Sequence, residues 1–170
     1  MTGRPASPGD GEAGARPHVS IPGDGTQQPW GNGSEIAVRL RAQQSGGRLG
    51  ATHFKAAKGE FAGLHRHTLE DELFLVAAGA VEVRADGEVS TLEAGGTVYL
   101  PRGSAHGYLV LEPDTEFFVV TTPGGFERFF EKVSSAIFAP VVGSNRAGVW
   151  SRDRVREIEA GLGTNLQWLD

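Results

Sequence analysis

Four residues of the types that bind metals stand in a spaced series. His65 and His67 are separated by one residue, Glu72 follows after a polar stretch, and His106 lies much farther along the chain. Neutral imidazoles and a carboxylate are ligands that divalent transition metals accept in proteins. The series therefore predicts that these four side chains hold one metal ion. The simpler alternative is that the histidines are ordinary buried or surface residues that bind no metal.

The spacing constrains how the first three residues are placed. In an extended strand alternate side chains share a face, so His65 and His67 project in the same direction. Glu72 lies an odd number of positions after His67, which requires a turn or bulge, and the polar residues between them favour one. Glu70 and Asp71 compete with Glu72 for the role of carboxylate ligand. The third histidine must come from a distant strand.

The expected donor set limits both the metal and the kind of site. Three imidazoles and one carboxylate suit Fe, Ni, Co, Mn or Zn, and the chain has no cysteine that would compete for the ion. Four protein ligands on a five- or six-coordinate ion leave positions open for water, a substrate or dioxygen. We therefore expect one divalent transition metal in a reactive site rather than a closed structural one.

Short strands are the elements that would position these residues. From residue 35 to residue 122, runs of β-branched, aromatic and aliphatic residues alternate with Gly, Pro and Asp, which is typical of an all-β sandwich or barrel. The pair Asp86-Gly87 is a two-residue hairpin signal. The expected strands span residues 36–40, 49–54, 72–79, 80–85, 97–101, 108–112 and 116–122.

The two ends of the chain differ from this central region. Residues 1–30 are rich in Gly, Pro and small residues and poor in aliphatic ones, which predicts a flexible tail. Residues 31–122 would form the barrel. Residues 123–170 would form a helical segment that packs on the barrel or on a dimer partner.

This C-terminal segment contains two helix signals. Between Phe126 and Val133, three phenylalanines and the valine stand at the spacing of one face of an amphipathic helix. That apolar face must pack against another surface. A second, shorter helix is expected to begin with Ser151 as its N-cap and to end at Gly161.

Composition excludes several classes of protein. The chain has 170 residues, enough for one domain with a real core, and a formal net charge of −5, which gives a nucleic-acid partner no electrostatic basis. The absence of cysteine excludes a disulfide framework, and neither a signal peptide nor an apolar run of membrane-spanning length is visible. We expect a soluble cytoplasmic protein with no membrane partner.

Glycines and a proline around the four candidate ligands complete two longer frames. The frames consist of Gly59, His65, His67, Glu72 and Gly79, and of Gly95, Pro101, Gly103 and His106. They match the paired motifs of the cupin superfamily except at the last position, where Val110 stands in place of the usual Asn. From about Gly46 to Asp170 the chain resembles single-domain cupins. It is similar among these to the bacterial quercetin-dioxygenase-like monocupins, because the run TTPGGFERFFEKV follows the last strands and a short helix precedes the LQWLD tail.

The resemblance implies a single-domain jelly-roll barrel (a double-stranded β-helix) with short C-terminal helices, usually dimeric, with the metal deep inside. By position, His65, His67 and His106 would be metal ligands. Glu72 would be both ligand and catalytic base, which removes the proton of a flavonol hydroxyl. This dual role is chemically reasonable because a loosely held carboxylate can detach far enough to accept a proton.

Two aromatic residues share the strand phase of the ligands. Phe74 and Tyr108 would line the substrate pocket, although ordinary core packing is the alternative for both.

The function implied by the resemblance is a metal-dependent dioxygenase that cleaves a hydroxylated aromatic or enolic, flavonol-like substrate with O2, as quercetin 2,3-dioxygenase does. The expected partners are a small-molecule substrate, O2 and a second copy of the chain in a homodimer. One alternative is a redox-neutral metal-dependent cyclase, isomerase or lyase of secondary metabolism. Another is a cupin that binds a small molecule without catalysis.

Overall fold

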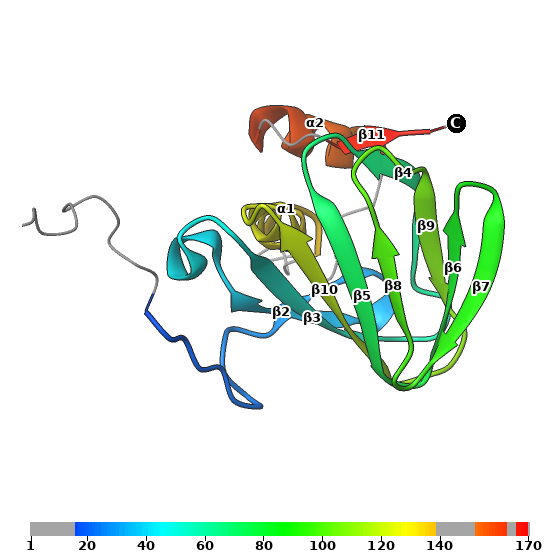
Figure 1. Cartoon of the computed structure of the whole chain (residues 1–170), viewed down its shortest axis with the longest axis horizontal. Coiled ribbons are helices and arrows are strands. Elements are labelled where there is room, and N and C mark those ends of the chain that lie inside the picture. Colours follow the sequence, from blue (N-terminus) through cyan, green and yellow to red (C-terminus); the bar gives the residue numbers. More distant parts are fainter. Residues whose placement is uncertain (1–15, 139–151, 163–165, 170) are drawn as a thin grey trace, which may run out of the picture.

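Two antiparallel sheets face each other in the computed structural model, which describes residues 16–138, 152–162 and 166–169 (Figure 1). One sheet has six strands in the order β1-β2-β3-β10-β5-β8, and the other has five in the order β11-β4-β9-β6-β7. This jelly roll confirms the all-β prediction.

Each strand predicted from the sequence has a counterpart whose ends differ by no more than two residues. The six-stranded sheet consists of β1 Gln28–Pro29, β2 Glu35–Leu40, β3 Gly50–Ala56, β10 Thr115–Thr122, β5 Asp71–Ala78 and β8 Thr97–Leu100. The five-stranded sheet consists of β11 Leu166–Trp168, β4 Phe61–His67, β9 His106–Val110, β6 Ala80–Ala85 and β7 Glu88–Glu93. The helices of the described residues are α1 Glu127–Val133, α2 Arg152–Leu162, the 3-10 helices η1 Gly31–Gly33 and η2 Ala42–Ser45, and the π-helix η3 Ser134–Phe138.

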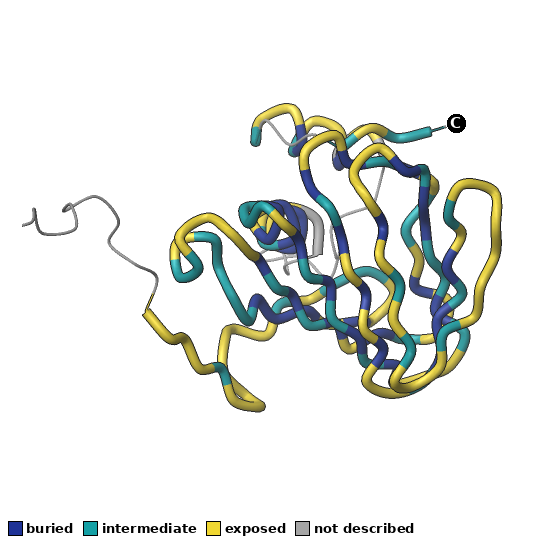
Figure 2. The backbone as a smooth tube through the Cα atoms, in the orientation of Figure 1, coloured by how far each residue is buried: buried dark blue, intermediate teal, exposed yellow. Residues whose placement is uncertain are grey.

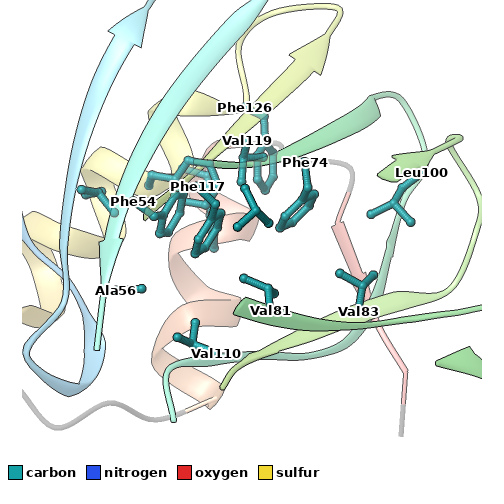
Figure 3. Close-up of a cluster of buried hydrophobic side chains, with 14 of the residues drawn as sticks. Phe54, Ala56, Phe74, Val81, Val83, Leu100, Val110, Phe117, Val119 and Phe126 are labelled. Carbon is teal, nitrogen blue, oxygen red and sulfur yellow. The ribbon is translucent and has the colours of Figure 1, made fainter. Parts of the chain in front are cut away.

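The core lies between the two sheets, and burial alternates along the strands that enclose it (Figure 2). In β10, every second residue from Thr115 to Thr121 is buried, as the two-residue period of a strand requires. Phe54 and Phe117 stack at 4.7 Å between ring centroids, and Val81 of the opposite sheet belongs to the same cluster (Figure 3). The aliphatic and aromatic residues that predicted strands are therefore also the residues that join the sheets.

The hairpin predicted at Asp86-Gly87 is present between β6 and β7. Ala85 and Glu88 pair on either side of the turn. Asp86 has φ 48 and Gly87 has φ 89. Positive φ at both central residues is what the common two-residue hairpin turn requires, and Asp and Gly are residues that adopt it.

Strand pairing begins inside the segment predicted as a tail. β1 pairs with β2, and Trp30 packs edge-on against Phe54 and Phe130 at 5.9 and 5.7 Å between ring centroids. The paired region thus starts before the barrel boundary predicted at residue 31. The flexibility predicted for residues 1–30 stays a prediction.

The described residues of the C-terminal segment pack on the barrel of their own chain. In α1, Phe129, Phe130 and Val133 are buried in the core cluster, as the helical period predicts. α2 contacts α1 and ends at Leu162, one residue beyond the prediction, whereas Ser151 lies outside the described residues. β11 was not predicted. It pairs with β4 and so joins this segment to the five-stranded sheet.

Candidate metal centre and its cavity

The four predicted ligands come together from three strands and both sheets. His65 and His67 stand at the end of β4, and His106 begins β9, where it pairs with His65. Glu72 is the second residue of β5, which belongs to the other sheet. The predicted bend lies at residues 68–69, where the chain crosses from one sheet to the other. The odd spacing between His67 and Glu72 therefore reflects a change of sheet.

A tight turn sets the position of the third histidine. Ser104 N–H donates to the carbonyl oxygen of Pro101 at 3.0 Å, and Gly103 has φ +87. Glycine at the third position of such a turn accepts this positive φ without strain. Gly103 N–H also donates to the carbonyl oxygen of His67 at 2.7 Å. The turn predicted from Pro101 and Gly103 is confirmed, and it ties the second frame to the first.

The side chains form a compact, buried donor cluster. One ligand atom from each of the four residues lies within 4.8 Å of the others, and all four residues are buried. His106 Nε2 lies 3.0 Å from Glu72 Oε2, and His67 Nε2 lies 3.4 Å from Glu72 Oε1. His65 stands 4.4 Å from His106 between ring centroids. This arrangement lets three imidazoles and one carboxylate converge on one cation.

The far ring nitrogen of each histidine faces an acceptor. His65 Nδ1 lies 2.7 Å from the carbonyl oxygen of Gly63, and His106 Nδ1 lies 3.1 Å from that of Ser104. A ring nitrogen that donates to a carbonyl must carry the proton, so Nε2 of these two histidines offers its lone pair to the cluster.

His67 has a carboxylate partner in place of a carbonyl. Its Nδ1 lies 3.7 Å from Glu70 Oε2, and neither of its ring nitrogens makes a hydrogen bond although the residue is buried. Buried polar nitrogens without a partner are costly. A cation bound at Nε2 of His67 would satisfy one of them, and this orphaned atom shows that the residues fit a metal ion.

The electrostatics of the cluster suit a divalent cation. Burial, together with the charge of His106, lowers the pKa of His65 to about 4. Burial alone would raise the pKa of Glu72, but the neighbouring His67 and His106 override it and hold that pKa below its usual value. For His67, Glu72 and Glu70 overcome burial and raise the pKa. At neutral pH the cluster therefore contains an ionised carboxylate and a neutral His65, which are the forms that bind metal.

The competing carboxylates are placed elsewhere. Asp71 Oδ1 accepts hydrogen bonds from the backbone and the side chain of Arg102, both at 2.9 Å, at the surface. Glu70 is buried beside the outer nitrogen of His67 and does not belong to the four-residue cluster. Glu72 is therefore the carboxylate that converges with the histidines.

A cavity of about 440 Å³ opens onto the cluster. Aromatic rings dominate its lining, and Phe74 and Tyr108 are among them, 5.6 Å apart between ring centroids. Both also pack in the core, and their contact with a substrate stays a prediction. The described residues that line the cavity include no Lys or Arg. The cavity therefore suits an uncharged ring system better than a small anion.

Two residues that the sequence analysis did not assign also line this cavity. Trp168 of β11 is opposite His65 in the β11–β4 pairing, and their rings lie 5.4 Å apart between centroids. Its indole N–H donates to Glu159 at 3.0 Å. Glu60 is the other, and it directly follows the first glycine of the motif frame.

Comparisons with known proteins agree with this fold. Residues 52–121 match the family model of the Cupin domain. The structure of KdgF from a Halomonas species matches with a TM-score of 0.58 and 25% identity, over 64% of this chain and 94% of that chain. An RmlC-like cupin from Shewanella frigidimarina matches with a TM-score of 0.57 and 19% identity, over 66% and 96%. The chain therefore has the cupin jelly-roll fold, and its residues 52–121 match the model of that domain.

A third structural match is a metalloprotein. Oxalate decarboxylase from Bacillus subtilis, with Mn(II) centres, matches with a TM-score of 0.52 and 22% identity, over 61% of this chain and 28% of that chain. At this identity the likeness concerns the fold alone. A search of curated protein sequences found no match. Among the described residues, none of the helices has the length and apolar character needed to cross a membrane.

Proposed function

We propose that the protein is a metal-dependent dioxygenase that cleaves a hydroxylated aromatic or enolic substrate of the flavonol type. The observation that supports this proposal is the aromatic cavity, which holds no Lys or Arg among its described lining residues and ends at His65, His67 and Glu72. A planar, uncharged ring system with an acidic hydroxyl fits both features. A small dicarboxylate could place one carboxylate on the metal, but the described lining offers no cationic side chain to the other.

The residues of the site have distinct roles in this proposal. His65, His67, His106 and Glu72 would hold the metal, which when bound supplies Lewis-acid activation and a position for dioxygen. Glu72, whose pKa is held low by the imidazoles, is ionised at neutral pH and accepts the proton of the substrate hydroxyl. Phe74 and Tyr108 contact the faces of the substrate rings and exclude water from them.

Metal content and oxygen uptake test this function. We would purify the protein without an affinity tag, measure metals by mass spectrometry, and record oxygen uptake with quercetin. We expect about one equivalent of Fe, Ni, Co or Mn in the wild type and its loss in His106→Ala. We also expect oxygen uptake in the wild type that Glu72→Gln abolishes. Asp71→Asn is the matched control, since this neighbouring carboxylate pairs with Arg102 outside the cluster. No metal in either protein would overturn the ligand assignment.

A redox-neutral reaction is the second candidate, supported by two carboxyl groups in one cavity. Glu60 and Glu72 both line it, and burial raises the pKa of Glu60 to about 7 while the pKa of Glu72 is lowered. Two carboxyls with separated pKa values can serve as acid and base. Turnover of an enolic substrate without oxygen, with Zn sufficient, would favour a cyclase, isomerase or lyase. Ligand binding without turnover would leave a binding cupin.

The homodimer and the cytoplasmic location stay proposals. On the outer face of the six-stranded sheet, Leu73 of β5 and Tyr99 of β8 pair directly, and they are 37% and 59% exposed. Together with Leu75 they give this face apolar side chains that a second copy would cover. Sedimentation velocity of the wild type and of Tyr99→Lys tests the dimer, which the variant should weaken.

A further inference from the structure

Glu60 is a buried acid that the four-ligand cluster does not use. It immediately precedes β4, lines the cavity and is only 4% exposed. Strict alternation would turn it away from His65, which lies an odd number of residues later. A register shift between Ala62 and His65 in the β4–β9 pairing corrects the phase, so that both side chains face inward.

The two oxygens of this carboxyl group have different surroundings. Oε1 accepts hydrogen bonds from the Tyr108 hydroxyl at 3.1 Å and from the Trp30 indole N–H at 3.0 Å. Oε2 is buried and has no hydrogen-bond partner. If Glu60 served only to join Trp30 to Tyr108 of the barrel, its Oε1 alone would suffice, because both hydrogen bonds go to that oxygen. A buried carboxyl oxygen without a partner, on a residue that lines a cavity, is costly unless a ligand group hydrogen-bonds to it.

The carboxyl group stands some way from the metal cluster. Val110 N–H donates to the Glu60 carbonyl oxygen at 2.8 Å, which places Glu60 opposite Val110, while His106 lies four residues earlier on the same strand. At the rise of a β-strand this separation is roughly 13 Å along the backbone. One ring cannot contact both ends, whereas a ligand of two or three connected rings can.

We propose that Glu60, held by Tyr108 and Trp30, is a second polar anchor of the cavity. Its free oxygen Oε2 binds a hydroxyl group on the outer ring of an aromatic ligand whose other end lies at the His/Glu cluster. The inference rests on the proposed function for the position of that other end. It specifies the substrate class further, as a ring system with hydrogen-bonding groups at both ends.

The protonation of Glu60 is consistent with this role. Burial raises its pKa to about 7, against the lowering effect of the bonds from Tyr108 and Trp30. Tyr108 is the titratable side chain that faces it from β9, and burial raises the pKa of that phenol well above its usual value. The proton of the acid then resides on Oε2, because Oε1 already accepts two hydrogen bonds. A ligand hydroxyl can accept this proton's hydrogen bond or donate to the ionised oxygen.

Binding to the zinc-loaded protein tests the anchor without turnover. We would titrate the wild type, Glu60→Leu and Glu60→Asp calorimetrically with the parent flavonol and with flavonols that carry one added hydroxyl on either outer ring. Leu keeps the volume and removes both oxygens, whereas Asp keeps the acid and withdraws it by one methylene. Zinc stoichiometry and circular dichroism show that each variant is folded.

In the wild type, one added hydroxyl should lower Kd about tenfold, the effect of one good hydrogen bond in a buried site. Glu60→Leu should abolish this gain while it changes the Kd of the parent flavonol much less. Should Glu60→Leu fail to fold, Glu60→Asp decides, and its gain should fall to less than about threefold. Three outcomes would overturn the inference. They are a gain in affinity that survives in these variants, no gain in affinity from either added hydroxyl, and no binding of any flavonol.

The outcomes separate this inference from the proposed function. Oxygen uptake without a Glu60-dependent gain overturns the anchor and leaves the dioxygenase. A Glu60-dependent gain without oxygen uptake supports the anchor and removes the dioxygenase.

Discussion

Glu127 should be one of the most costly residues to replace in this protein. It begins α1 and is 2% exposed. Its Oε1 accepts a hydrogen bond from the backbone N–H of Ala42 at 2.8 Å, and its Oε2 accepts one from Gly125 at 2.7 Å. The carboxylate thus joins the start of α1 to η2, and α1 carries the phenylalanines that line the cavity.

The expected magnitude follows from these two bonds. A hydrogen bond to a charged group contributes about 1.5–3 kcal/mol, so the loss of two in Glu127→Ala should lower the free energy of unfolding by about 3–6 kcal/mol. The matched control is Glu131→Ala on the same helix. Glu131 pairs with Arg41 at 2.6 Å, but both side chains are partly exposed, and such a pair contributes about 0–1 kcal/mol. Urea denaturation of both variants measures the difference.

Substitution of Gly50 tests the position of the Glu127 carboxylate. A Cβ atom at Gly50 would overlap Oε2 of Glu127, and it would lie 3.2 Å from Oγ1 of Thr121. Gly50→Ala should therefore destabilise the wild type by about 1–3 kcal/mol, as overpacking does. In the Glu127→Ala background the overlap is gone, and the cost should fall by at least about 1 kcal/mol. Additive costs, or a Glu127→Ala effect no larger than that of Glu131→Ala, would refute this reasoning.

Three further predictions concern the site and its surroundings. Glu70→Gln removes the carboxylate beside His67 Nδ1 and should weaken metal binding about 10–100-fold, which competition with a chelator measures; an unchanged affinity would deny Glu70 this role. The pKa of Glu60 is raised from 4.5 to about 7, so its ionisation costs the folded state about 3 kcal/mol as pH rises from 4.5 to above 7. Glu60→Gln should lack that loss in urea unfolding. Arg102 lowers the pKa of Asp71 to about 2, so the stabilisation by this pair should be present above pH 4 and lost toward pH 2. Asp71→Asn should show no such change, nor any change in metal content.

Much of the metal site could be predicted because it depends on local backbone rules. The alternation of a strand places His65 and His67 together, and the polar residues after them gave the bend that turns Glu72 inward. Pro101 and Gly103 indicated the turn before the third histidine, and the structure has that turn. These features need only the sequence within a few residues, so the sequence contains the information.

Contacts between distant segments could not be predicted in the same way. Trp168 reaches the site because β11 adds to the edge of β4, and the short run Leu166–Trp168 carries no strong strand signal of its own. Glu60 faces inward only because a register shift reverses the strand phase before His65. Neither an added edge strand nor a register shift is visible in a periodic pattern, since both depend on the partner strand.

Val110, which stands where the cupin motif usually has Asn, can be explained from its surroundings beside Glu60. Val110 is 1% exposed, packs in the core and does not line the cavity, so an amide at this position would be buried among apolar side chains. Its backbone N–H is already paired with the Glu60 carbonyl oxygen. The polar side chain at this depth comes instead from Glu60, directly across the strand pair. The motif position that lacks its usual Asn therefore lies at the level of Glu60, and the two substitutions Glu60→Gln and Val110→Asn should affect ligand binding in a coupled way.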